Sequence, residues 1–95
     1  MLIWSETALA DVVQLRRFLT KNNPDAASRA AQVLTKGTAM LLKHPSLGCR
    51  REDRTDRELI IPFGKRGYVL RYRQEGTDIV ILKIWHSLEK RTKDL

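Results

Sequence analysis

A chain of 95 residues, 42% of them hydrophobic and 31% charged, is large enough for one small hydrophobic core and too small for two. This size excludes a multidomain enzyme, and the apolar content excludes a disordered coil. No stretch approaches the ~18 consecutive apolar residues that a membrane span needs. We therefore expect residues 1–95 to form a single soluble domain.

The amino-terminal sequence and the cysteine content bear on location and on metal binding. Residues 1–6 lack a basic segment followed by an apolar run and a small-residue cleavage site, so the sequence predicts a cytoplasmic protein with no membrane partner. Cys49 cannot form a disulfide within the chain, and His44 and His86 do not complete a zinc site with it. We expect neither a metal nor another cofactor.

The charge balance is strongly basic, with 18 Lys and Arg against 11 Asp and Glu and a formal charge of +7. Such a charge favours polyanionic partners, which include nucleic acid, a nucleoprotein and an acidic protein. It can also serve only to keep a small protein soluble. Charge alone does not choose among these interpretations.

The first half of the chain predicts a short strand and two helices. Residues 2–4 are apolar, and Ser5 is a good helix N-cap. Apolar residues then recur at helical spacing over residues 6–21, where Ala8, Leu9, Val12, Val13, Leu15 and Leu19 share one arc. The segment Asn22–Asp25 indicates a stop and a second helix start, and His44-Pro45 ends that helix. These helices are expected to form an antiparallel hairpin packed on another layer.

The second half predicts three strands. The charged stretch from Cys49 to Arg57 is interpreted as a loop, and the hydrophobic period then changes to two. The expected strands cover residues 58–61, 68–73 and 78–86, with tight turns that make them antiparallel. The predicted fold class is α+β, in the order strand-helix-helix-strand-strand-strand. Its four-stranded antiparallel sheet has the helical hairpin on one face, and the opposite face is partly open and basic.

Few kinds of chemistry fit these residues. Without a Gly-rich phosphate loop, a nucleophile elbow or a paired-histidine motif, nucleotide hydrolysis, acyl transfer and metal hydrolysis lack their usual groups. Metal-independent RNA cleavage needs a proton carrier, for which His86 is the candidate, and cations on the phosphorane. Arg57, Arg71 and Arg73 are the candidate cations. Alternatively, His86 caps a strand and the arginines form a solvated face, and the residues alone favour this second interpretation.

The two tryptophans can be placed in the same way. An exposed tryptophan can stack on a base, but large aromatic side chains are mostly buried. Trp4 lies on the first predicted strand and Trp85 precedes His86 on the last. We expect both in the core or in an interface.

Six segments, in this order and at this spacing, carry a family resemblance. They are Ile3-Trp4-Ser5 with Ala8-Leu9-Ala10-Asp11, Asn23-Pro24-Asp25-Ala26-Ala27, His44-Pro45 with Leu47-Gly48, Arg57-Glu58-Leu59, Tyr68-Val69-Leu70-Arg71-Tyr72 and Ile81-Leu82-Lys83-Ile84-Trp85-His86. Over nearly its whole length the chain resembles the RelE/ParE superfamily of bacterial type II toxins, particularly the ParE-like branch. The resemblance implies the same fold and a growth-inhibiting toxin. It also implies an acidic, partly disordered antitoxin that wraps the toxin in a hetero-oligomer.

The superfamily that the chain resembles contains two activities. RelE-like members cleave mRNA in the ribosomal A site, whereas ParE-like members poison DNA gyrase. RelE-like nucleases carry an arginine directly after the tyrosine that opens the middle strand of the last three, and lysines on the strand before it. Here those places hold Val69 and the apolar segment Leu59-Ile60-Ile61-Pro62. A histidine near the end of the last strand, where His86 stands, occurs in both branches and does not discriminate between them.

The resemblance therefore implies first a gyrase inhibitor without chemistry of its own. The second hypothesis is a metal-independent endoribonuclease that acts on the ribosome and mRNA through His86, and the third is a regulatory module that binds its antitoxin and helps to occupy an operator. In each case we expect the basic loop and strand ends to contact the target or the antitoxin. The residues concerned are Arg50, Arg51, Arg54, Lys65, Arg66, Lys90 and Arg91.

Overall fold

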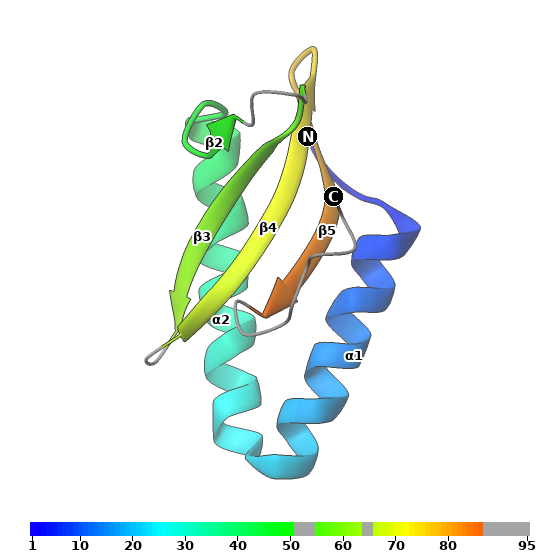
Figure 1. The fold of residues 1–95 in the computed structure, drawn as a ribbon, viewed down its shortest axis with the longest axis vertical. Coiled ribbons are helices and arrows are strands. Elements are labelled where there is room, and N and C mark those ends of the chain that lie inside the picture. The colour runs from blue at the N-terminus through cyan, green and yellow to red at the C-terminus, as the bar shows by residue number, and fades with distance from the viewer. Residues whose placement is uncertain (51–54, 64–65, 87–95) are drawn as a thin grey trace.

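A computed structural model describes residues 1–50, 55–63 and 66–86, and of Arg66 it describes the backbone alone. The elements in chain order are β1 (Leu2–Trp4), α1 (Glu6–Asn22), α2 (Pro24–Lys43), β2 (Cys49–Arg50), β3 (Arg57–Phe63), β4 (Arg66–Glu75) and β5 (Asp78–His86), as Figure 1 shows. The α+β class and the order of the predicted elements are confirmed. Neither of the two helices is long and apolar enough to cross a membrane.

The sheet has the strand order β1-β5-β4-β3-β2, and β3, β4 and β5 are antiparallel as predicted. It differs from the predicted four antiparallel strands in two respects. β1 is parallel to β5, because the helical hairpin returns the chain to the end of the sheet where it began, so β1, β3 and β5 run in one direction (Figure 1). Cys49 and Arg50 do not lie in the predicted loop but form the short strand β2 on the outer edge of β3.

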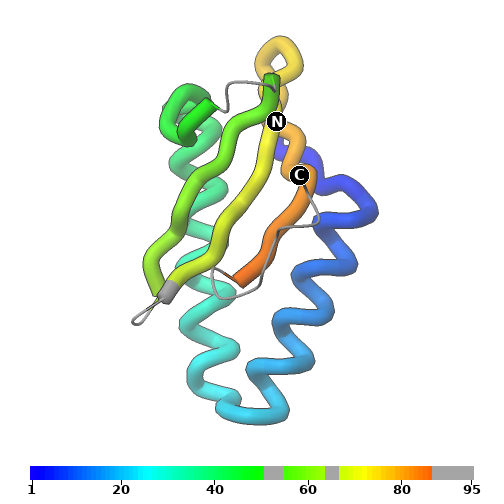
Figure 2. The backbone as a smooth tube through the Cα atoms, in the orientation of Figure 1, coloured from blue at the N-terminus to red at the C-terminus, as the bar shows by residue number. Residues whose placement is uncertain are grey.

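Both helices lie on the same face of the sheet, with α1 packed mainly against β5 and α2 against β3 (Figure 2). Side chains alternate along β4, so Tyr68, Leu70 and Tyr72 point toward the helices and are fully buried. Leu41 of α2 is equally buried, and Ile81 of β5 completes the centre of the core. The predicted shared face of Tyr68, Leu70 and Tyr72 is therefore the core face.

The outer edge of β5 is completed by polar side chains beside it. β1 ends at Trp4, opposite Ile81, and the pairing of β5 with β4 skips Leu82. The Ser5 hydroxyl donates to the Leu82 carbonyl at 3.0 Å and also caps α1 by accepting from an amide of the first turn. One turn further on, the Asp11 carboxylate accepts a hydrogen bond of 2.9 Å from the Ile84 amide. Backbone groups that no neighbouring strand could reach are thus paired.

Removing the Asp11 carboxylate tests how much its hydrogen bond with the Ile84 amide stabilises the fold. Asp11→Ala leaves the partly buried Ile84 amide without its acceptor, and we expect a loss of about 1–3 kcal/mol in the free energy of unfolding. Asp11→Asn keeps a carbonyl oxygen and should lose less. Urea unfolding measures the stability, and hydrogen exchange at the Ile84 amide measures how well that amide is protected from solvent. Equal stabilities for all three proteins would show that the bond contributes nothing.

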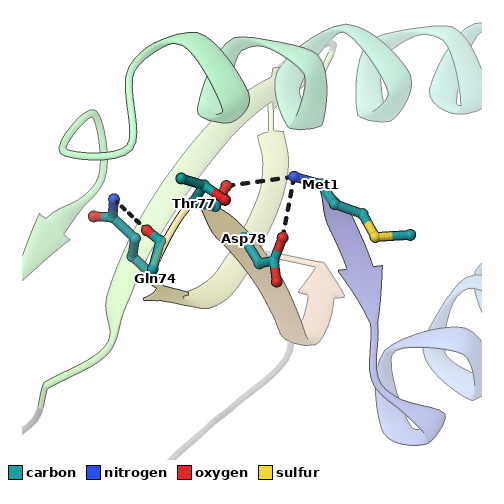
Figure 3. Close-up of polar contacts among 5 residues, drawn as sticks. Met1, Gln74, Thr77 and Asp78 are labelled. Atoms are coloured by element: carbon teal, nitrogen blue, oxygen red, sulfur yellow. Dashed lines mark hydrogen bonds and ion pairs between the residues drawn. The ribbon is translucent and has the colours of Figure 1, made fainter.

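The start of β1 is held against the turn between β4 and β5. The amino group of Met1 lies 3.3 Å from both the Thr77 carbonyl oxygen and the Asp78 carboxylate (Figure 3). The turn itself is closed by the Gln74 amide, which donates to the Gly76 carbonyl, and Gly76 has a φ of 61° that favours glycine. These contacts fix the register of β1 at its exposed end.

The loop from α2 to β2 is fixed by one tyrosine. The Tyr72 hydroxyl donates to the Pro45 carbonyl at 2.7 Å and accepts from the Gly48 amide at 2.8 Å. Burial raises the pKa of the Tyr72 phenol above its ordinary value, so the hydroxyl keeps the proton that it donates. Arg57 donates to the Gly48 carbonyl at 2.9 Å, and both polar groups of the Gly48 backbone are therefore satisfied.

Candidate functional site

A row of three rings crosses the ends of the three long strands on the helix face of the sheet. His86 ends β5 and lies opposite Tyr68 in the register, and the two rings meet edge to face with centroids 5.4 Å apart. On the other side of Tyr68, the Phe63 ring of β3 lies at 5.6 Å. Burial raises the pKa of the Tyr68 phenol, so this ring stays neutral over the physiological range.

The carboxyl-terminal half of α1 faces this row of rings. The helix and the rings together form the walls of a groove of about 530 Å³. We call it the His86 groove; its lining is Asp11, Gln14, Leu15, Phe18, Leu19, Phe63, Tyr68, Ile84, Trp85 and His86. Phe18 stands at its margin with 65% of its surface exposed. A mostly apolar, aromatic groove with a few polar groups suits a side chain or short segment of another protein.

Arg71 lies on the other face of the sheet, since it alternates with Tyr72 along β4. Its side chain is buried, and its Nε and Nη2 atoms donate to one Glu58 carboxylate oxygen at 3.1 and 2.8 Å. The guanidinium also lies 5.1 Å from the centroid of the Trp85 ring. Arg71 therefore takes part in a buried structural cluster.

The other two candidate arginines are also engaged. Arg73, on the same face as Arg71, forms an exposed ion pair with Glu75. Arg57 binds the Gly48 carbonyl and lies opposite Tyr72 in the register, four residues along β4 from the position of His86. At the usual rise of a strand, that separation is about 13 Å.

The structure does not bring the predicted catalytic set together. His86 lies at one end of the helix face, Arg57 lies toward the other end, and Arg71 and Arg73 point away from that face. Stabilisation of a phosphorane requires cations within a few ångströms of the proton carrier. Among the described side chains, the lining of the His86 groove contains no arginine or lysine.

The predicted binding cations are only partly covered by the structure. Arg50 is exposed on β2, and Arg66 begins β4. The remaining five lie outside the described residues: Arg51, Arg54, Lys65, Lys90 and Arg91. No group of three or more His, Cys, Asp and Glu side chains able to hold a metal occurs within the described parts of the chain.

Two further expectations can be compared with the structure, and one residue was not expected. Trp85 is buried and Trp4 is half-buried against the core, as expected. Leu9 and Val13, which share the apolar arc of α1, are about half exposed, because the sheet covers only the side of the helix that carries Ala8. Phe18 is a groove residue that the sequence reasoning misses, although its place off the apolar arc is a signal for a surface aromatic.

Comparison with known proteins identifies the family of the chain. The family model described as the ParE toxin of the type II toxin-antitoxin system parDE matches residues 2–91. The chain is 43% identical over 84 residues to Toxin RelE3 of Caulobacter vibrioides, covering 88% of this chain and 90% of the relative. It is 39% identical over 87 residues to Toxin RelE1 of the same organism, with 92% of each covered.

A solved structure described as the chromosomal ParDE TA system from P. aeruginosa has the same fold. It gives a TM-score of 0.74 at 23% identity, covering 90% of this chain and 92% of that chain. The fold and the matches define a toxin of the RelE/ParE superfamily of type II toxin-antitoxin systems. Within it, the chain belongs to the ParE toxin family, whose model covers it from β1 through β5.

Proposed function

We propose that this toxin inhibits DNA gyrase in the cytoplasm by binding to it, without a bond-breaking step of its own. The observation that carries the proposal is the separation of His86 from Arg57, Arg71 and Arg73 described above. Each of these three arginines is held by a carboxylate or a backbone carbonyl, and none of the three lines the groove that contains His86. Membership in the ParE toxin family supports gyrase as the target.

The His86 groove is the surface that we assign to the target. Protein interfaces depend on a few large side chains packed in water-excluding pockets, and Phe18 beside the Tyr68 and His86 rings provides such a centre. The net charge of +7 favours association with acidic surfaces, both of the target and of the antitoxin that neutralises the toxin. Arg50 and the other candidate binding cations would form a positively charged region around the groove and contact those acidic surfaces.

A ribosome-dependent endoribonuclease is the second candidate. The two curated relatives carry RelE names, and His86 lines an accessible groove as a general acid or base must. This activity would require cations beside His86 other than Arg57, Arg71 and Arg73 in the positions described above. It would need no metal.

Two reactions run in parallel decide between these functions. Purified toxin is added to a gyrase supercoiling assay and to a coupled translation reaction, and DNA breaks and mRNA cuts are mapped. We expect gyrase-dependent DNA breakage with intact mRNA, and only a partial loss for His86→Ala. Cut mRNA, unaffected gyrase and complete loss of activity in His86→Ala would establish the endoribonuclease instead.

A matched pair of exposed apolar residues tests the groove itself. Phe18 is 65% exposed at the groove, and Ile60 is 69% exposed on the opposite face of the sheet. Phe18→Glu should weaken gyrase inhibition by about tenfold or more, because it places a charge in a desolvated contact. Ile60→Glu should leave inhibition nearly unchanged. Equal effects of both substitutions would argue against the His86 groove as the target surface.

A further inference from the structure

The side chains of β5 change face once along the strand. Residues opposite each other on neighbouring strands lie on the same face of a sheet, so the helix-facing residues of β4 identify those of β5. The partners of Tyr68, Leu70 and Tyr72 are His86, Ile84 and Ile81. The step from Ile81 to Ile84 is three residues, whereas side chains of a regular strand alternate every two. One surplus residue, Leu82, is therefore absorbed in a β-bulge between them.

This bulge decides which aromatic side chain of β5 lies beside Tyr68. If the first half of β5 kept its place and the strand continued without a bulge, Lys83 and Trp85 would point toward the helices. His86 would then point toward the opposite face. In the structure it is the Trp85 ring that lies on the opposite face, 5.1 Å from the Arg71 guanidinium, while the His86 ring meets Tyr68. A shift of one residue would thus exchange His86 for Trp85 opposite Tyr68.

Ser5 holds the bulge from the outer edge of β5. Its amide donates to the Ile81 carbonyl at 3.0 Å, and its hydroxyl donates to the Leu82 carbonyl at 3.0 Å. Successive carbonyl groups of a regular strand point in opposite directions, so a bulge is needed to present both to one residue. Without the hydroxyl, the partly buried Leu82 carbonyl would lose this donor. The Ser5 side chain therefore favours the bulge at this one position.

Lys83 opposes a bulge nearer the carboxyl-terminal end of β5. In that arrangement Lys83 would lie opposite Leu70, which is fully buried in the core. In the structure it lies opposite Arg71 on the other face and is partly exposed. Burial of an unpaired ammonium group costs more than the loss of one hydrogen bond. Lys83 is thus the stronger determinant of the bulge position, and the Ser5 hydroxyl is the weaker one.

We propose that Ser5 and Lys83 are positioning residues, which place His86 in the His86 groove by fixing the bulge at Leu82. The residues that line the groove include neither of them, so both act through the backbone of β5. Bulges are common beside functional sites, where they re-aim a side chain. The proposal rests on the proposed function for the importance of the groove, but the place of the His86 ring can be measured without gyrase.

Removing both determinants should exchange the two rings. In Lys83→Leu the shifted register buries a leucine in place of a lysine, so the Ser5 hydroxyl is left to hold the bulge. In Lys83→Leu with Ser5→Ala neither determinant remains. NMR measures the result through nuclear Overhauser contacts of the Tyr68 ring with His86 or with Trp85. The ratio of the His86 contact to the Trp85 contact should fall by about fivefold or more when the hydroxyl is removed.

Asn23→Ala is the matched control for Ser5→Ala. Both substitutions remove a side chain that caps a helix, but Asn23 caps α2 by accepting from the Ala26 amide, away from β5. Lys83→Leu with Asn23→Ala should therefore keep the contact ratio of Lys83→Leu. Ser5→Thr retains a hydroxyl and, in place of Ser5→Ala, should restore that ratio. An unchanged ratio with Ser5→Ala, or an equal fall with Asn23→Ala, would overturn the proposal.

Deletion of Leu82 is an independent test, which also serves if the double variant does not fold. The deletion removes the surplus residue, so a regular β5 keeps its native partners on β4 and the contact between Tyr68 and His86 should remain. Adding Ser5→Ala to this chain should no longer change that contact, because there is no bulge left to hold. A contact between Tyr68 and Trp85 in the deletion variant would contradict the assignment of Leu82 as the surplus residue.

Gyrase inhibition by the same variants separates this proposal from the proposed function. Exchange of the two rings with unchanged inhibition would support the positioning role and refute the His86 groove as the target surface. A contact ratio that Ser5→Ala does not change in Lys83→Leu would refute the positioning role, whatever the inhibition. We expect the rings to exchange and the inhibition to fall with them.

Discussion

Replacing Tyr72 with alanine is expected to remove about 3–5 kcal/mol from the free energy of unfolding. That is a large share of the roughly 5–15 kcal/mol that stabilises a small domain. The Tyr72 side chain is fully buried, and its loss creates a cavity at the centre of the core. It also removes the hydroxyl that joins the Pro45 carbonyl to the Gly48 amide. Urea unfolding followed by circular dichroism measures the change.

Tyr72→Phe separates the hydrogen bonds from the packing. The ring remains, but the buried Gly48 amide loses its acceptor, so we expect a cost of about 1–3 kcal/mol. Tyr68→Phe is the control, because Tyr68 is equally buried and its hydroxyl makes no hydrogen bond with the described residues. If Tyr72→Phe were no less stable than Tyr68→Phe, the hydroxyl would not hold the loop.

Gly67→Ala is the second substitution with a large expected effect. Gly67 lies opposite Pro62 where β3 and β4 approach their connecting turn. A Cβ atom there would lie 2.5 Å from the Ile61 carbonyl oxygen and 3.3 Å from the Pro62 Cα atom. Both are backbone atoms that cannot rotate away, so the two strands must separate. We expect a loss of about 3 kcal/mol, measured by urea unfolding.

The control for Gly67 is a glycine that is needed for another reason. Gly76 has a φ of 61°, and a Cβ atom added there would meet none of the described atoms within 4 Å, so its replacement causes backbone strain but no clash. Gly76→Ala should cost about 1 kcal/mol, and Gly76→Asn less, because asparagine tolerates this conformation. A Gly67→Ala loss no larger than that of Gly76→Ala would contradict the steric argument.

The elements can be predicted from the sequence because each has a local signal. Ser5 caps α1, Asn23 with Pro24 starts α2, and the alternation of Tyr68, Leu70 and Tyr72 defines β4. The direction of β1 has no such signal, since it depends on where the helical hairpin returns the chain. The pairing of Cys49 and Arg50 in β2 is likewise made by backbone groups, which any exposed residue can supply.

The candidate site is less predictable, because the relevant geometry comes from pairing between strands. The alternation along β4 already separates Arg71 from Tyr72, but only the register with β3 places Glu58 beside Arg71 and fixes that arginine in an ion pair. The position of His86 beside Tyr68 similarly depends on the pairing of β4 with β5. Phe18 reaches the groove only because the second half of α1 lies beside the ends of the strands.

The pairing of β1 with β5 also has a consequence for synthesis of the toxin. Ser5 bonds to Leu82, 77 residues further along the chain, and Leu2 lies opposite Ile79. At usual elongation rates the ribosome needs roughly 4–15 s to make that intervening stretch. Until then β1 has no strand beside it, and α1 lacks the strand against which it mainly packs. We therefore expect nascent chains that end before β5 to be unfolded and harmless, so that toxicity begins only after β5 has been made.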